Sequence, residues 1–561
     1  MPIFKEYLKI LISHSKYYKK YKMQTIFLGF IFFFYTILTY PIPYLTKLLI
    51  DEAIIKRNIE LFYHLIIGIF IIQVLLSLIG YFQSYLSALL NNKLLHEVRI
   101  DIIDKINRIS LQIFEKYNEG YLHSRFYQDT EYLSSCFIQL TFMIFKNILT
   151  FIIGLILCLS INVKLTILIT IMSFINYYIN SYFGVFLKKY RATTLEQFAK
   201  LSEKALLIIK MKKISTIFRN YTKSKEIYHN TFTNLYNSLK IIFRYIFISE
   251  ETTSFNRALT NIFLLLIGGY LIIKGQLTVG ALIALQSYSL FISSSIAFIN
   301  NAKQSLYMAI PAYKRICEIY NMEEDCKNST VLINIDHIEL DINKFSYNDD
   351  NVVLLDTKID INKGDRIAII GESGCGKTSL LRLLLGFYQF NGKIKVNETE
   401  YDDIQSIIRE KSSFVEQDPF LFEGTVEENV IFSHEENNQE RLIQVLKKAH
   451  AYFFVSKLPL KTKSIIQNSE LQLSKGQAQR ITIARALYKN PEFLLMDEPT
   501  ASIDNKSQSY IIETIKNLEK DVTVIIVTHR KELLKICNKI IEIKEKKCYT
   551  YDNKKYFNKE Y

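Results

Sequence analysis

The most constraining feature of this 561-residue chain is a series of long stretches without charged residues. The first lies between Lys22 and Lys47 and contains 24 residues. A helix of that length, at roughly 1.5 Å per residue, exceeds the roughly 30 Å hydrocarbon core of a bilayer. Further uncharged runs occupy residues 65–92, 147–163, 165–187, 258–273 and 275–302. The pattern predicts six membrane-spanning helices, at about residues 23–46, 65–92, 140–163, 165–187, 250–273 and 275–302.

The fifth uncharged run has only 16 residues, so its helix must begin before Arg257 and carry polar side chains into the bilayer. Helical spacing places Glu250, Ser254, Arg257 and Asn261 on one face. Two interpretations stay open. The face lines a cavity that accepts polar cargo, or Glu250 and Arg257 pair with each other below the membrane.

The net charge of +14 comes mainly from segments that flank the apolar runs. Lys and Arg number six in residues 1–22, seven in 93–146 and fourteen in 188–257, against three in 47–64. The positive-inside rule therefore predicts that both termini and the two long loops are cytoplasmic in a multi-pass protein of the cell membrane, in contact with its lipids. No nucleic-acid partner is predicted, because no base-reading motif accompanies the charge.

The two long loops contain no proline, and Gly120 is their only glycine. Such segments favour helices that continue well past the membrane, although two ordinary loops are the alternative. We therefore predict that residues 1–320 form an α-helical six-span membrane domain with long cytoplasmic helical extensions.

After Pro311 the pattern changes to short apolar strands alternating with polar helices, which predicts an α/β domain over residues 330–561. Within it, the strand RIAII leads into G-x-x-x-x-G-K-T and then an amphipathic helix. This is the context of a loop that cradles nucleotide phosphates, with backbone N–H groups and a helix N-terminus facing the negative charge. The predicted nucleotide-contacting residues of the loop are Gly371, Glu372, Ser373, Gly374, Cys375, Gly376, Lys377, Thr378 and Ser379.

Within this loop, Lys377 is expected to reach the β- and γ-phosphates and the Thr378 hydroxyl to ligate Mg²⁺. The apolar strand in PEFLLMDEPT ends in Asp497 and Glu498, which predicts one carboxylate at the metal and the next beside a water that attacks the γ-phosphate. The seven cysteines show no metal-ligand spacing. Cys375 is either reactive, because it sits near Lys377 at a helix N-terminus, or a small space-filler.

The segment LSKGQAQRITIARAL, together with these two motifs, resembles the signature of the ATP-binding cassette (ABC) transporters. Leu473, Ser474, Gly476 and Gln477 match the family's L-S-G-G-Q, and Lys475 departs from its usual glycine. The resemblance implies that this segment crosses a dimer interface and completes the ATP site of a partner cassette.

The resemblance also assigns roles to four residues that follow the family's order along the chain. It implies that Tyr347 stacks on adenine, that Gln417 senses the metal and the membrane domain, and that His529 holds the γ-phosphate. Asp504 in ASID matches a further nucleotide-site element. Glu498, His529 and Gln417 are thus the expected catalytic residues, with Thr378, Gln417 and Asp497 at the metal.

The membrane half resembles the ABC exporters, in which the membrane domain precedes the cassette on one chain. YPIPYLTKLLIDEAI is similar to their first outer loop, EGYLHSRFYQDTEYL to their first coupling segment with Gly120, Arg125 and Asp129, and GQLTVGALIAL to the entry of the sixth span. Asn468 and Glu470 replace the Glu and Gly usual before the signature.

The combined expectation is an ATP-hydrolysing half-transporter that uses ATP and Mg²⁺ and works by alternating access. A homodimer is favoured over a pair with a different half-transporter, because Glu498 and His529 are both present. The expected cargo is a peptide. The alternatives are a lipid or drug exporter that works as a heterodimer, and an ATP-gated channel or membrane sensor. The Ile, Lys, Asn and Tyr bias indicates a bacterial source.

Overall fold

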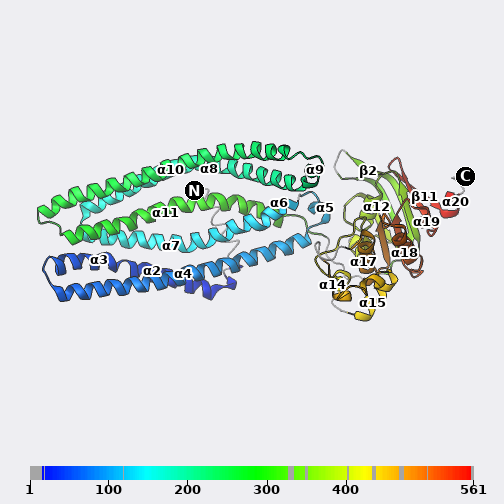
Figure 1. Ribbon diagram of the computed structural model, residues 1–561, viewed down its shortest axis with the longest axis horizontal. Helices are drawn as coiled ribbons and strands as arrows, with labels where there is room; N and C mark the ends of the chain where they lie inside the picture. The colour runs from blue at the N-terminus through cyan, green and yellow to red at the C-terminus, as the bar shows by residue number, and fades with distance from the viewer. Residues whose placement is uncertain are drawn as a thin grey trace. The chain divides into compact units, whose positions relative to one another are not determined.

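The computed structural model describes residues 16–17, 19–117, 119–325, 334–347, 351–400, 404–432, 438–466, 473–501 and 503–557. Its contacts divide the chain into two compact units (Figure 1). The first comprises the chain up to Asn107 and Tyr117–Met322, and the second comprises Arg108–Lys116 and everything from Glu323 onward. The short segment 108–116 therefore belongs with the second unit, although the predicted membrane domain of residues 1–320 includes it.

The first unit is entirely helical in its described residues. Its elements are α2 (Lys22–Thr39), α3 (Pro41–Leu48), η1 (Leu49–Ile54), α4 (Ile59–Arg108), α6 (Glu119–Ser124), η2 (Arg125–Asp129), α7 (Thr130–Ile161), α8 (Val163–Lys210), α9 (Lys212–Ile217), α10 (Thr222–Ile273) and α11 (Val279–Tyr320). Among the residues that the structure describes, six helical segments are long and apolar enough to cross a membrane, as the predicted membrane domain requires. α8 and α10 continue far beyond their apolar parts, as the lack of glycine and proline predicts.

Side chains at the ends of the spans cap individual helices and connect η1 to the start of α11. Asn162 caps α8 by accepting from the Leu165 N–H, and Thr278 caps α11 by accepting from Ala281. Asp51 of η1 accepts from the Thr278 hydroxyl at 2.5 Å and from the Gly280 N–H at 2.8 Å. The segments that resemble the first outer loop and the sixth-span entry are therefore in direct contact.

Helix α10 buries one polar face against α8 and exposes the other. The buried face carries Ser249, which donates to Asn180 Oδ1 at 3.2 Å, and Asn256, which donates to the Met172 carbonyl at 3.1 Å. Glu250 and Arg257 lie on the exposed side of α10, and no ion pair joins them in the described chain. The paired interpretation of Glu250 and Arg257 therefore lacks support.

Residues Gly120, Arg125 and Asp129, expected in a coupling segment, belong to the first unit. Asp129 is buried and accepts from Arg315 of α11 at 2.5 and 2.9 Å. The segment that packs with the second unit lies just upstream and contains the short helix α5 (Leu111–Phe114).

The second unit is built on a six-stranded sheet of order β11-β10-β3-β9-β8-β5. Its strands are β3 (Arg366–Gly371), β5 (Ser412–Val415), β8 (Phe493–Asp497), β9 (Thr523–Val527), β10 (Lys539–Lys544) and β11 (Lys547–Asp552). All neighbours pair in parallel except β10 and β11. Strands β8 and β9 are fully buried, which explains their uninterrupted apolar sequences.

A three-stranded antiparallel sheet, β2-β1-β4, adjoins this core, and β6 pairs with β7. These strands are β1 (His337–Ser346), β2 (Val352–Asn362), β4 (Asn391–Val396), β6 (Gly424–Thr425) and β7 (Ile465–Ile466). The helices are α12 (Lys377–Leu384), α13 (Ile404–Lys411), α14 (Val426–Ile431), α15 (Gln439–Lys448), α16 (Tyr452–Val455), η3 (Lys461–Lys463), α17 (Lys475–Tyr488), α18 (Asn505–Lys516), α19 (Lys531–Leu534) and α20 (Asn553–Phe557).

Candidate active site

The phosphate-type loop leaves the end of β3 and enters α12, as predicted. Gly374 and Gly376 have φ of 81° and 108°, a backbone conformation that favours glycine. A Cβ at Gly376 would lie 2.7 Å from Val353 Cγ1. Glu372, Ser373 and Gly374 are exposed and Cys375 is partly buried. The loop therefore presents its main chain at the surface in front of a helix N-terminus, which is suited to binding an anion.

Lys377 is buried inside this loop. Its Nζ donates to the carbonyl oxygens of Gly371 and Glu372, each at 2.8 Å. The ammonium is thus held at the centre of the loop by two neutral acceptors, with no carboxylate partner in the described residues. A phosphate oxygen is a stronger partner for this cation than a carbonyl.

Thr378 and Asp497 meet across the end of the sheet. The Thr378 hydroxyl donates to Asp497 Oδ2 at 2.7 Å. Asp497 is 5% exposed, and its burial raises the pKa of the carboxyl above its ordinary value. Hydroxyl, carboxylate and amide oxygens are the donors that Mg²⁺ prefers, so this pair, with Gln417 nearby, fits such an ion chemically.

Glu498, Gln417 and His529 form a second group beside that pair. Gln417 Nε2 donates to Glu498 Oε2 at 3.2 Å, and His529 Nε2 lies 3.9 Å from Glu498 Oε1. Glu498 has φ of 43°, and its N–H donates to the Val527 carbonyl at 3.0 Å. The backbone at Glu498 is strained relative to an ordinary strand end, which is common for residues held in active sites.

The strand order explains why these distant segments meet. The loop follows β3, His529 follows β9, Asp497 and Glu498 end β8, and Gln417 follows β5. These four strands are consecutive neighbours in the parallel part of the sheet. Their carboxyl ends share one edge, where ligands bind in open α/β sheets.

Tyr347 lies at the rim of the loop and is 38% exposed. Its hydroxyl is 2.8 Å from Ser379 Oγ, and its ring packs edge-on against Tyr388 at a centroid distance of 5.1 Å. The Tyr388 hydroxyl in turn donates to Glu115, which also pairs with Arg382 at 3.4 Å. Tyr388 and Glu115 are not among the site residues predicted from the sequence. The aromatic residues in GFYQF after α12 were the available signal, but nothing in the sequence indicates their partner.

The signature residues hold the start of α17. Ser474 and Gln477 form a reciprocal capping box, with hydrogen bonds of 2.9 and 3.2 Å. Lys475, the departure from the family pattern, pairs with exposed Asp418 at 2.6 Å. Asn468 and Glu470 lie outside the described residues.

Gly476 and Asp504 lie where α17 meets α18. A Cβ at Gly476 would lie 2.5 Å from Ser507 Oγ. Asp504 caps α18 by accepting from the Ser507 N–H at 2.9 Å, and this hydrogen bond lowers the pKa of its carboxyl. In the described chain, the hydrogen bonds of Ser474, Gln477 and Asp504 are local to these helix starts and do not involve the phosphate-type loop.

Comparison with known proteins agrees with this geometry. Residues 25–296 match the ABC transporter transmembrane region, and residues 354–501 match the ABC transporter family of ATP-binding domains. The chain therefore belongs to the ABC transporter family, in the exporter-type arrangement that fuses the membrane region to the cassette. It is an ATPase of the class coupled to transmembrane transport, as predicted.

Individual relatives cover nearly the whole chain. One relative is the putative multidrug export ATP-binding/permease protein YgaD of Bacillus subtilis (strain 168). It is 27% identical to this chain, and the alignment covers 96% of this chain and 94% of YgaD. A Staphylococcus aureus (strain NCTC 8325 / PS 47) protein with the same description is 28% identical, and the alignment covers 96% of this chain and 95% of that protein. The structure of a bacterial Atm1-family ABC exporter with ATP bound aligns with a TM-score of 0.84 at 17% identity, covering 96% of each chain. This last likeness supports the fold.

Proposed function

We propose that two copies of this chain form an ATP-driven exporter, each ATP being held between one copy's phosphate loop and the other copy's Ser474 region. The observation that carries the proposal is the convergence of Lys377, Asp497, Glu498 and His529 on one sheet edge. In the described chain, the side chains of Ser474 and Gln477 hydrogen-bond only within the start of α17, so this N-terminus is available to a phosphate from a second copy. Both Glu498 and His529 are intact, which favours two identical sites and hence a homodimer.

Within each site the chain's own groups divide the work. Lys377 would exchange its two carbonyl acceptors for phosphate oxygens, and Tyr347 would lie against the adenine. Thr378, Asp497 and Gln417 would hold Mg²⁺, which when bound supplies positive charge against the phosphate oxygens. Glu498 would accept a proton from the attacking water while Gln417 and His529 fix its carboxylate from two sides.

The six helical spans would carry the cargo, with both termini and the long helical extensions in the cytoplasm. Closing of the two cassettes on ATP would move these extensions and switch the membrane domains between inward- and outward-facing states. The names of the relatives favour a drug-like cargo, whereas the exposed polar side of α10, with Glu250 and Arg257, favours cargo with polar groups such as a peptide.

The test is Glu498→Gln in the full chain, purified into lipid discs, with Glu519→Gln as the matched control because Glu519 is 73% exposed and pairs only with Lys448 in the described chain. Loss of a general base lowers turnover by about 10²–10⁴-fold. We expect Glu498→Gln to bind ATP and accumulate as a closed dimer, and Glu519→Gln to behave as the parent. Near-parental turnover in Glu498→Gln would remove Glu498 from this role. Ion conductance without ATP-dependent flux in parental vesicles would favour a channel.

A further inference from the structure

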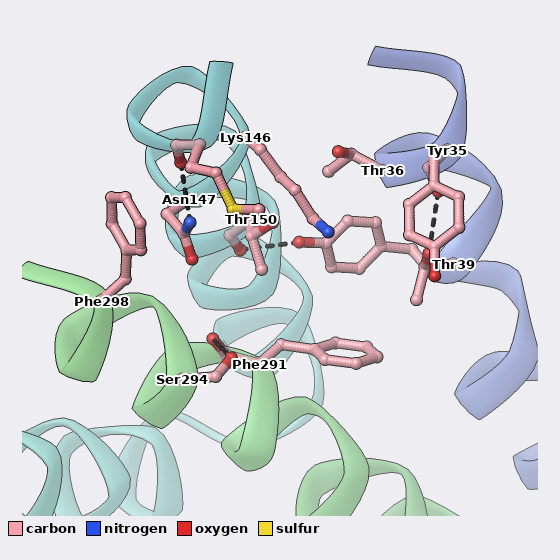
Figure 2. A pocket seen from close by; sticks show the side chains of 11 residues that line it. Tyr35, Thr36, Thr39, Lys146, Asn147, Thr150, Phe291, Ser294 and Phe298 are labelled. Atoms are coloured by element: carbon pink, nitrogen blue, oxygen red, sulfur yellow. Dashed lines mark hydrogen bonds between the residues drawn. The ribbon is translucent and has the colours of Figure 1, made fainter. Parts of the chain in front are cut away.

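A cavity of about 400 Å³ lies within the first unit between α2, α7 and α11 (Figure 2). Cavities of roughly 300–1,000 Å³ are the usual size for small-molecule sites. Figure 2 shows Phe291 and Phe298 on the α11 side and Tyr35 on the α2 side, with Lys146 reaching from α7 toward α2. The walls thus combine aromatic surface with one cationic group.

Most hydroxyl groups of the cavity already have a partner. Thr36, Thr39 and Ser294 donate to carbonyl oxygens of their own helices at 2.7, 2.8 and 3.0 Å. The Tyr40 hydroxyl donates to the Thr150 carbonyl at 2.8 Å. These donors are therefore occupied, and they leave the Lys146 ammonium as the strongest group able to bind a ligand.

Lys146 lies over the ring of Tyr35, with its Nζ 4.8 Å from the centroid. No Asp or Glu pairs with it among the residues the structure describes. It lies 15 residues before the end of α7 at Ile161, about 22 Å along the helix, so it falls within a hydrocarbon core of roughly 30 Å. A charge inside a span is costly, and such residues usually pair with another charge or face a functional cavity.

We propose that this cavity binds an amphipathic organic anion, whose acidic group pairs with Lys146 and whose apolar body lies against Phe291 and Phe298. The inference rests on the proposed export function and names the chemical class of its cargo. The negative group would replace the missing carboxylate partner in a low-dielectric environment, where an ion pair is strong. The aromatic walls offer apolar contact without selecting one molecular shape, which fits a range of anions with one charge and a flat body.

The experiment compares two dyes that share one skeleton. 8-Anilinonaphthalene-1-sulfonate carries a sulfonate, and N-phenyl-1-naphthylamine is its neutral counterpart. Both are titrated into the full chain in lipid discs, with ATPase stimulation and binding by equilibrium dialysis as separate readouts. The variants are Lys146→Met, Lys146→Arg, and Lys164→Met as a control at an exposed lysine outside the cavity.

We expect Lys146→Met to raise the concentration of sulfonate dye needed for half-maximal binding by about 10- to 100-fold, the value of one charge-assisted contact. Lys146→Arg and Lys164→Met should stay near the parent, and the neutral dye should bind all four proteins alike. Equal binding of the sulfonate dye to the parent and Lys146→Met, or no preference of the parent for it, would overturn the proposal. Basal ATPase activity and its loss in Glu498→Gln report on the proposed function separately, so each failure is distinguishable.

Discussion

Gly476→Ala should separate α17 from α18 and lower the stability of the cassette. The added Cβ would lie 2.5 Å from Ser507 Oγ and 2.7 Å from Ser507 Cβ, and the second atom cannot rotate away. Overpacking of this kind typically costs about 1–3 kcal/mol, and the two close contacts place it near the upper value. Alanine has a higher helix propensity than glycine, which stabilises the variant by about 1 kcal/mol. The net expected loss is about 2 kcal/mol.

Native-state hydrogen exchange on the full chain measures this loss directly as a local opening free energy at the amides of α17 and α18. Ser507→Gly in the same chain removes both clashing atoms, so the double variant should recover most of the loss, with a coupling energy of about 2 kcal/mol. Gly184→Ala in α8 is the matched control, since no atom lies within 4 Å of its Cβ position. A loss in Gly476→Ala that Ser507→Gly does not reduce would refute the steric explanation.

Three further outcomes are expected. Lys475→Gly should change the free energy of unfolding by less than about 1 kcal/mol and keep ATPase activity. The ion pair of Lys475 with Asp418 is exposed, and a cation at a helix N-terminus is unfavourable. Loss of ATPase activity in this variant would show that Lys475 has a direct role in that activity. Bound ATP should protect Cys375 from N-ethylmaleimide, measured by mass spectrometry, because the thiol lies inside the phosphate loop; equal labelling with and without ATP would contradict this placement. Burial by itself raises the pKa of the Asp365 carboxyl. Its ion pair with Lys539 and the hydrogen bonds from the Asn362 N–H and the Asn538 side chain lower the pKa by more, so the net pKa is below the ordinary value. Asp365→Asn should therefore lower the free energy of unfolding by about 1.5–3 kcal/mol at pH 7. In acid unfolding experiments, the difference in stability between parent and variant should narrow as the pH falls through the depressed pKa of Asp365. A difference that does not change with pH would show that the ion pair does not contribute.

The sequence alone determined the two-part organisation and the location of the chemistry along the chain. Uncharged runs longer than a bilayer is thick have few alternatives to membrane helices, and the strand–glycine loop–helix order around Lys377 is specific for phosphate binding. The absence of proline and glycine likewise predicted the long extensions of α8 and α10, because nothing in these segments interrupts a helix.

The tertiary structure decided which of these residues meet, because contacts between distant segments depend on strand order and helix packing. Gln417, Glu498 and His529 come together only because β5, β8 and β9 are neighbours in the sheet. The packing also paired Asp129 of η2 with Arg315 of α11, which lies 186 residues further along the chain. Lys146 lies inside the predicted span of residues 140–163, just before its uncharged run, and the sequence indicates no partner or site for it. Lys146 becomes the cationic residue of a cavity lining only because α2 and α11 pack near α7. A cavity whose aromatic walls come from three separate helices leaves no pattern in a single stretch of sequence.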